Sequence, residues 1–373
     1  MHALRVSGLS PATTYRYVLT AGGETREGSL TTAPSDDAKT PFTFLIYGDN
    51  RSNDDAHAAI VKDLIGAPGD FLVNSGDLVA NGAQLDLWQR FFDIEGPLLR
   101  DRCLFAAIGN HELLETSGAN FLRYFGEDTP DATGLRKLYR TVRWENTRFF
   151  FLNGTDEFTT SDERHWIDGE LAKTDNEANL VWRIVIVHHG PWSSSLHGNN
   201  PRLWNGGMLD IFKAHHIDLI VSGHDHVYER GESHGMAYLV SGGGGAPLYP
   251  IGDPLKSTRK GESSYHYIEA KIDGDTFSMT AKRIDGALLE ACGFKKGSDW
   301  DCDSPSVHGN ATSSAASSTA SSGGTKSSQN PDDSTTSDKS SKCGCKMPGT
   351  GESSPFAWLG VLVSAALLRR RKA

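Results

Sequence analysis

The residues with the clearest chemical potential are aspartate, asparagine and histidine side chains that stand directly after apolar runs of the chain. In residues 222–230 (SGHDHVYER), for example, two histidines closely follow the run HIDLIV. Carboxylate oxygens, amide carbonyl oxygens and imidazole nitrogens suit Zn, Mn, Fe and similar divalent or trivalent ions. The pattern therefore predicts a metal site. Its candidate ligands are Asp49, Asp77, Asn110, His188, His189, His224 and His226.

The apolar runs before these side chains are rich in β-branched and aromatic residues, which predicts buried strands. Helical patterns lie between them at residues 53–67, 161–174 and 206–216, and Ser161 is the expected N-cap of the second helix. Alternating strands and helices predict an α/β fold with a mostly parallel core covered by helices. Ligands bind such sheets beyond the carboxyl ends of the strands, so the polar clusters are expected to meet in one place.

The order of the motifs is more informative than any one of them. A GD dipeptide or a histidine at a strand end is more often structural than metal-binding. The chain has the ordered series GD, GD, GNHE, HH and GHxH, and chance agreement of the whole series is negligible. This series resembles the calcineurin-type metallophosphoesterases. The segments GHDHVYER and YLVSGGGGAPLY are most similar to the purple acid phosphatase branch, and the resemblance covers roughly residues 5–285.

The resemblance implies a two-sheet β-sandwich flanked by helices (an α/β/β/α fold), with two divalent or trivalent metal ions (Zn, Mn or Fe) at its mouth. Carried over by position, Asp49 and His226 bind the first ion and Asp77 bridges both ions. Asn110 and His224 bind the second ion.

The resemblance also assigns one histidine of the pair His188–His189 to the second ion. His188 is favoured, because the nine-residue step from it to His197 matches the family spacing without a gap. His189 is the alternative. The histidine that does not bind this ion is then available as a hydrogen-bond donor behind the ligands.

The chain departs from the family pattern at two positions. Many members have a histidine where this chain has Arg51, and purple enzymes have a tyrosine where this chain has Ala80. No tyrosinate is then available to bind Fe(III) and give a purple colour, which favours two divalent ions. Arg51 is expected either to grip a phosphate oxygen or to form a salt bridge with Asp54 or Asp55.

The same resemblance implies catalytic roles for further residues. His111 is expected to donate a hydrogen bond to the leaving ester oxygen, and His197 to contact the phosphoryl oxygens from the rim. The predicted reaction is hydrolysis of a small phosphomonoester by a metal-activated hydroxide. A phosphodiesterase or nucleotidase of the same superfamily is one alternative, and a non-catalytic surface binding protein is another. Residues 241–247 (SGGGGAP) are expected to form a turn beside the site, because they lack the lysine of a phosphate-binding loop.

Composition limits the expected partners. The chain has 373 residues, with 37 basic and 47 acidic side chains and a net charge of −10. Nucleic-acid binders usually present a basic face, so nucleic acid is not an expected partner. The expected segments are a fibronectin type III-like remnant (1–34), a linker (35–41), the metallophosphoesterase domain (42–285), a loop that Cys292 and Cys302 can close by a disulfide (286–303), a disordered Ser/Thr-rich stalk (304–342) and a C-terminal tag (343–373).

The C-terminal end of the chain indicates export, and the N-terminal end indicates that the start of the chain is missing. Residues 9–20 (LSPATTYRYVLT) resemble the last third of a fibronectin type III domain, with Tyr15 as its tyrosine corner. The order CGCK, a short apolar run (356–368) and RRRK resembles the C-terminal sorting tags of myxobacterial-type surface proteins. The tag implies attachment to the membrane or cell surface and a sorting protease. Because residues 1–17 have no apolar signal core, the true start of the chain is expected to be missing.

Overall fold

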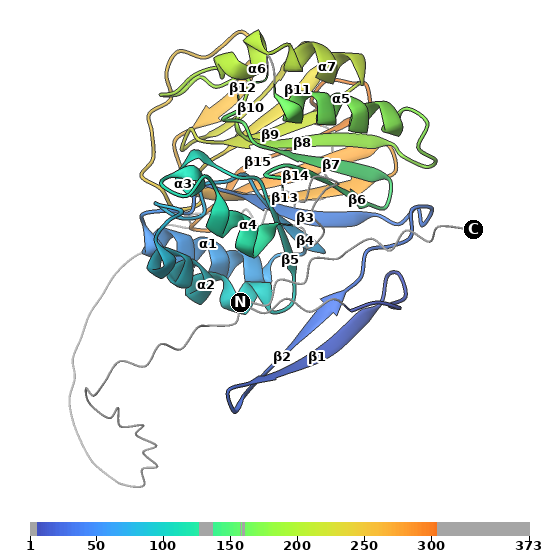
Figure 1. Ribbon diagram of the computed structural model, residues 1–373. Coiled ribbons are helices and arrows are strands. Elements are labelled where there is room, and N and C mark those ends of the chain that lie inside the picture. Colours follow the sequence, from blue (N-terminus) through green and yellow to red (C-terminus); the bar gives the residue numbers. More distant parts are fainter. Residues whose placement is uncertain (1–5, 127–136, 157, 159–160, 304–373) are drawn as a thin grey trace, which may run out of the picture. The chain divides into compact units, whose positions relative to one another are not determined.

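The computed structural model describes residues 6–126, 137–156, 158 and 161–303 (Figure 1). The predicted stalk (304–342) and C-terminal tag (343–373) lie outside the described residues. Within the described ranges, every helix falls short of the length and apolar character needed to cross a bilayer.

The first of two large sheets has six strands in the order β15-β14-β13-β3-β4-β5. Strands β3, β4 and β5 are parallel, so their carboxyl ends lie at the same edge. Strands β13, β14 and β15 extend the sheet in antiparallel fashion. The bounds are β3 (Phe42–Tyr47), β4 (Phe71–Asn74), β5 (Cys103–Ala106), β13 (His266–Asp273), β14 (Thr276–Arg283) and β15 (Leu288–Lys295).

The second sheet has seven strands in the order β12-β10-β11-β9-β8-β7-β6. Its centre is parallel, from β7 through β8 and β9 to β11. Both sheets therefore present parallel carboxyl ends, as the alternating sequence pattern predicts. The bounds are β6 (Arg140–Trp144), β7 (Thr147–Leu152), β8 (Trp182–His189), β9 (Leu219–Gly223), β10 (Tyr228–Ser233), β11 (Met236–Ser241) and β12 (Thr258–Glu262).

The two sheets pack face to face over an aromatic core, which includes Phe44, Phe71 and Phe149. The rings of Phe44 and Phe71 stack at 5.4 Å, and Phe149 meets Phe44 edge-on at 5.3 Å. Helices cover the outer face of each sheet, which confirms the predicted α/β/β/α layers (Figure 1). The helices over the first sheet are α1 (Asp54–Gly66), α2 (Leu85–Leu99) and α4 (Ala119–Phe125), and those over the second are α5 (Asp162–Thr174), α6 (Pro201–Asn205) and α7 (Met208–Ala214).

The three helices predicted from the sequence are present as α1, α5 and α7. The hydroxyl of Ser161 accepts a hydrogen bond from the Arg164 N–H at 3.1 Å, as an N-cap should. Helix α2 was not predicted. It contains Pro97, which usually interrupts a helix, but its buried face fits the first sheet.

The N-terminal segment forms a separate two-stranded hairpin, β1 (Thr14–Ala21) and β2 (Glu24–Thr31). The Ser10 N–H donates to the Tyr15 hydroxyl at 2.9 Å, and the Tyr17 hydroxyl donates to the Arg100 carbonyl at 2.7 Å. The second contact ties the hairpin to the end of α2. The described residues hold only a hairpin here, so the fibronectin type III assignment stays a prediction.

Residues 286–303 are not simply a loop, as the sequence suggested. They contain β15, which pairs with β14 along its whole length and belongs to the first sheet. The proposed disulfide between Cys292 and Cys302 is present and fastens the following segment to this strand. The strand was missed because its residues (LLEACGFK) are too mixed to show a clear alternation.

Candidate metal centre

All the predicted ligands lie at the carboxyl edge shared by the two sheets. Asp49 follows β3, Asp77 follows β4, and Asn110 begins the short helix α3 (Asn110–Leu113) after β5. The second sheet contributes the histidine pair at the end of β8, and His224 and His226 directly after β9. Two sets of three residues have potential metal-ligating atoms that lie within 4.8 Å of one another inside each set. The first set is Asp49, Asp77 and His188, and the second set is His188, His189 and His224.

The first set is deeply buried, and histidine nitrogens lie close to its two carboxylates. The Oδ1 atom of Asp49 lies 3.5 Å from His226 Nε2 and 3.9 Å from His188 Nε2. The Oδ1 atom of Asp77 lies 3.3 Å from the same His188 nitrogen. Within the described part of the chain, Asp49 Oδ1 and His188 Nε2 have no hydrogen-bond partner. Buried polar atoms normally have one, so these atoms have the character of ligands that face a cation.

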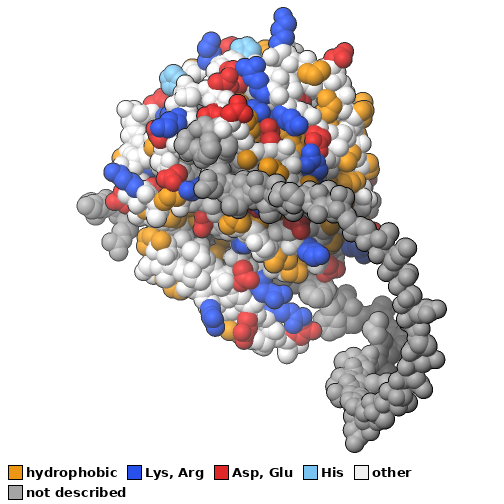
Figure 2. Space-filling model, turned by 180° about the vertical axis from the view of Figure 1, so that it is seen from behind, with side chains coloured by type: hydrophobic (Ala, Val, Ile, Leu, Met, Phe, Trp, Pro, Cys, Tyr) orange, Lys and Arg blue, Asp and Glu red, His pale blue; other side chains and the backbone are white. Residues whose placement is uncertain are grey.

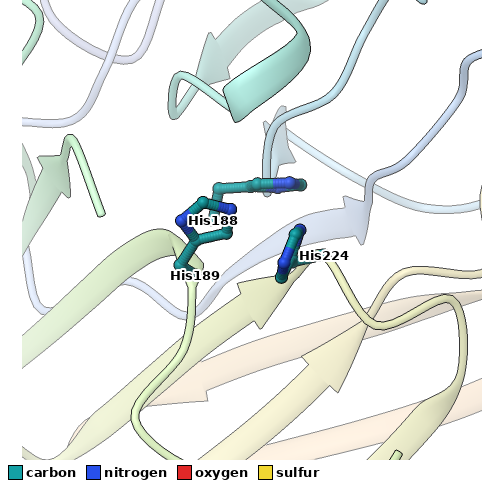
Figure 3. Close-up of side chains that lie close together, drawn as sticks. All are labelled: His188, His189 and His224. Carbon is teal, nitrogen blue, oxygen red and sulfur yellow. The ribbon is translucent and has the colours of Figure 1, made fainter. Parts of the chain in front are cut away.

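The second set lies nearer the surface. His189 Nε2 is 3.0 Å from Asn110 Oδ1, and the His189 and His224 rings are 3.9 Å apart. Figure 3 shows the rings of His188, His189 and His224 gathered at the ends of β8 and β9. The histidine that contacts Asn110 is therefore His189, whereas the spacing argument favoured His188 as the partner of Asn110.

Backbone carbonyl groups orient three of the histidines. Since a carbonyl oxygen only accepts hydrogen bonds, the facing Nδ1 must carry the proton, and Nε2 is left to face the site. Ser75 O accepts from His188 Nδ1 at 2.9 Å, Pro247 O from His226 Nδ1 at 2.6 Å and Ala80 O from His111 Nδ1 at 2.6 Å.

The backbone at the site is held in an unusual conformation. Asp49, Asp77 and His224 have φ angles of 57°, 55° and 70°, in the left-handed region that residues other than glycine rarely adopt. Such conformations persist where the surrounding structure enforces them, and they gather at functional sites. Glycines directly before two of the predicted ligands leave room for the carboxylates. A Cβ atom at Gly109 would collide with the Asp77 carboxylate, and one at Gly223 with the Asp49 carboxylate.

The charges of the site separate its histidines into two kinds. Burial alone would lower the pKa of His188, but Asp77 and Asp49 outweigh it and raise the pKa to about 9. Burial and the neighbouring His188 lower the pKa of His189 to about 3, and the same causes lower the pKa of His224. Burial would raise the pKa of Asp77, yet His188, His111 and Arg51 lower it. His189 and His224 are thus neutral at pH 7, whereas the two carboxylates favour the protonated form of His188, whose proton a bound metal ion would displace.

Glu112, the last residue of the GNHE motif, supports the site, a role that the sequence pattern did not predict. Its carboxylate is fully buried and accepts hydrogen bonds from the N–H groups of Asp77 (3.0 Å), Val79 (3.1 Å) and Gly109 (2.9 Å). Burial and the Asp77 charge raise the pKa of Glu112 to about 8. One side chain therefore ties the loop after β4 to the loop after β5.

The Glu112→Gln variant is expected to bind metal about 10–100-fold more weakly, because both oxygens of the carboxyl group can accept from backbone N–H groups in either protonation state, whereas an amide NH₂ cannot accept. Glu95→Gln is the matched control, since Glu95 is also buried and accepts from Tyr47 and His57, neither of which is a predicted ligand. Both variants should lose stability in urea unfolding, but only Glu112→Gln should lose metal affinity in a titration. Equal metal affinity in the two variants would refute this role.

Arg51 occupies an unexpected place. Its guanidinium lies 3.1 Å from Asp77 Oδ2 and 3.2 Å from His226 Nε2, so it contacts two predicted metal ligands. The alternative salt bridge to Asp54 or Asp55 is not formed, and Asp54 pairs with Arg90 at 2.7 Å instead. Arg51 is thus a fixed positive charge at the edge of the first set of ligands.

His111 and His197 lie on the open side of the centre. His111 Nε2 is 3.8 Å from Asp77 Oδ2, and its side chain is partly exposed. The exposed His197 stacks on His224 at 4.0 Å, and its N–H donates to the buried Asp225 at 2.9 Å. Both predicted catalytic histidines therefore border the predicted metal ligands.

The glycine-rich segment 241–247 packs directly behind the site. The N–H of Gly244 donates to Gly48 O at 2.8 Å, and the N–H of Ala246 donates to Asp49 O at 2.7 Å. The segment continues to Tyr249, whose ring stacks on His226 at 4.0 Å. The segment therefore holds Asp49 and His226 in position. The sequence placed it beside the site but did not show these contacts.

A family profile described as calcineurin-like phosphoesterase matches residues 42–228, which is half of the chain. With the fold and the arrangement of Asp, Asn and His side chains described above, the chain belongs to the calcineurin-like phosphoesterase family.

Individual relatives point to the purple acid phosphatases. Purple acid phosphatase 22 of Arabidopsis thaliana is 26% identical over 239 residues, which are 62% of this chain and 53% of that protein. An uncharacterized protein of Mycobacterium tuberculosis is 28% identical over 263 residues, 60% of this chain and 49% of that protein. The chain thus spans about half the length of these curated relatives. A solved purple acid phosphatase from yellow lupin seeds shares the fold, with a TM-score of 0.68 and 16% identity over 78% of this chain and 61% of its own.

These relatives imply a dinuclear metal centre, and the residues present fit one. Two buried carboxylates share a pocket with the histidines of the two sets. Asp49 Oδ1 and His188 Nε2 are the buried polar atoms of this pocket that lack a hydrogen-bond partner among the described residues. Oxygen and nitrogen donors of this kind suit Zn, Mn and Fe, without selecting one of them.

Proposed function

We propose that this protein hydrolyses small phosphomonoesters with the help of two metal ions. The observation that carries the proposal is the buried cluster of Asp49, Asp77 and His188, in which Asp49 Oδ1 and His188 Nε2 lack a hydrogen-bond partner among the described residues. Membership of the calcineurin-like phosphoesterase family and similarity to purple acid phosphatases support it.

The contacts suggest how the ligands are shared. Asp49 and His226 would hold the first ion, and Asp77 would serve both ions. Asn110, His224 and His189 would hold the second ion. We assign His189 rather than His188 to this ion, since its Nε2 lies beside Asn110 Oδ1.

Bound ions supply Lewis acidity and lower the pKa of water, which makes hydroxide available near neutral pH. The protein then has to orient the ester and assist departure of its alcohol. His111 Nε2 faces away from the Ala80 carbonyl, so the imidazolium form would donate its Nε2 proton toward the leaving oxygen. The Arg51 guanidinium and the His197 ring donate to phosphoryl oxygens, which carry the negative charge of the substrate.

The surface and the disulfide are consistent with the rest of the proposal. On the face shown in Figure 2, the basic side chains of the described residues are interspersed with acidic ones, as suits a small substrate better than a nucleic acid. The Cys292–Cys302 disulfide suits an oxidising compartment, which supports export. Attachment at the cell surface, and a sorting protease, are proposed on the sequence of the C-terminal tag alone.

The proposal predicts that the purified chain binds about two metal ions and releases phosphate from monoesters. The measurement is metal analysis of the protein after stripping and reloading with Zn²⁺, Mn²⁺ or Fe, followed by assays of monoesters, diesters and nucleotides. Preferred cleavage of a diester or a nucleotide would replace the proposed substrate class. A loaded protein that cleaves none of them, or a protein that binds no metal, would leave the binding-protein alternative.

A further inference from the structure

The two histidines at the end of β8 serve different parts of the centre. Successive side chains of a strand point to opposite faces of the sheet. His188 is completely buried, and its neighbours are Asp49 and Asp77. His189 is partly exposed, and its neighbours are Asn110 and His224. The HH motif therefore delivers a buried imidazole beside the two carboxylates and a more exposed one beside Asn110, although the ligand atom of His188 also lies within 4.8 Å of those of His189 and His224.

The free nitrogen of His188 is aimed at the first set. Its Nδ1–H donates to the Ser75 carbonyl at 2.9 Å, which leaves Nε2 facing Asp77 Oδ1 at 3.3 Å and Asp49 Oδ1 at 3.9 Å. Asp49 Oδ1 is in turn 3.5 Å from His226 Nε2. Two donor atoms that each bind one ion at about 2.1 Å lie about 3 to 4 Å apart at the usual ligand angles. The three measured separations fall within this range.

We propose that His188 is a direct ligand of the first metal ion, alongside Asp49, Asp77 and His226. The inference rests on the proposed function and extends it, because the ligand set carried over from the family gives one histidine of this pair to the second ion and neither to the first. It also explains how the chain tolerates its two departures from the family pattern.

Those departures leave the first ion short of ligands. Arg51 is a cation, and Ala80 has no donor atom in its side chain, so neither can bind a metal ion. Without His188, the first ion has Asp49, Asp77 and His226 as its protein ligands. An imidazole from the buried side supplies a fourth. Because imidazole is neutral where tyrosinate is negative, this set carries less negative charge and suits a divalent ion better than Fe(III).

A different arrangement of the same residues has to be separated from this one. If His188 carries a proton on Nε2, it donates a hydrogen bond to Asp77 and does not touch the ion. Nuclear magnetic resonance of the Co²⁺-loaded protein distinguishes the two arrangements. Only an imidazole bound directly to paramagnetic Co²⁺ gives a strongly shifted N–H signal. The Nδ1–H groups of His188 and His226 are bonded to carbonyls and buried, so both exchange slowly enough to be observed.

The full chain loaded with Co²⁺ is expected to show three slowly exchanging, strongly shifted N–H signals, from His188, from His226 and from His189, whose ring also bonds a backbone carbonyl, that of Gly154. In His188→Gln one of these signals should vanish, and bound Co²⁺ should fall from about two ions to one per chain. The affinity for the lost ion should drop by more than about 100-fold, beyond the range for residues that only support a ligand. In His189→Gln the slow signals of His188 and His226 should remain, because that variant loses the other ion.

His57→Gln is the matched control, since His57 is also buried and bonded to a carboxylate, that of Glu95, away from the centre. It should keep both ions and all three signals. Two or fewer slow signals in the wild-type protein overturn the inference even if His188→Gln fails to fold, and so does a folded His188→Gln that keeps both ions with affinities within about tenfold of wild type. A wild-type protein that does not bind two ions refutes the proposed function instead.

Discussion

The Asp77→Asn variant is expected to lose more than about 100-fold in turnover of a chromogenic phosphomonoester, together with most of its bound metal. Asp77 is fully buried at the junction of the two sets of ligands, and its carboxylate faces His188, His111 and Arg51. An amide keeps one oxygen but loses the negative charge and the second ligand atom, so it cannot bridge two cations. Asparagine also tolerates the left-handed backbone at this position, where φ is 55°.

The measurement pairs kcat on metal-reconstituted protein with metal analysis of the same sample. Asp175→Asn is the control, because it removes one carboxylate at the end of α5, where its partners are Arg183 and His215 and not a predicted ligand. It should retain wild-type turnover and metal content. An Asp77→Asn protein with two ions and near wild-type kcat would exclude the bridging role.

The fold and the composition of the site were largely predictable from the sequence, for a physical reason. Parallel strands bring their carboxyl ends to one edge, so polar residues directly after the strands must meet there. Asp49 after β3 and Asp77 after β4 follow this rule, as does His224 after β9. The predicted α/β/β/α layers follow from the same alternation of strands and helices.

The contacts that orient the predicted ligands were not predictable in this way. A motif shows that two histidines are adjacent, but the strand register decides which of them contacts Asn110, and a step count toward His197 favoured the other one. The role of Glu112 depends on three N–H groups from two separate loops. The carbonyl of Pro247 that orients His226 belongs to a glycine-rich segment without side-chain signals. Long-range backbone contacts of this kind leave no local pattern in the sequence.

His111 has the geometry of a proton donor to the leaving group. Its Nδ1–H is bonded to the Ala80 carbonyl at 2.6 Å, so a second proton on Nε2 faces the open side of the centre, 3.8 Å from Asp77 Oδ2. The backbone of His111 makes separate contacts, since its N–H donates to Asp77 Oδ1 at 3.1 Å and its carbonyl accepts from the Gly82 N–H at 2.8 Å. A change of the side chain therefore leaves the metal ligands in place.

The His111→Gln variant is expected to lose about 10²–10⁴-fold in kcat on an alkyl phosphomonoester while its metal content stays full. The loss should be much smaller on a nitrophenyl ester, whose leaving group departs without a proton. The control His165→Gln removes a histidine that is also bonded to a backbone carbonyl, that of Ser161 on α5, and should change neither substrate. An equal loss on both esters would show that His111 does not act on the leaving group, and a parallel loss of metal would make it a ligand instead. The dependence of the defect on the leaving group thus separates proton donation from metal binding within one variant.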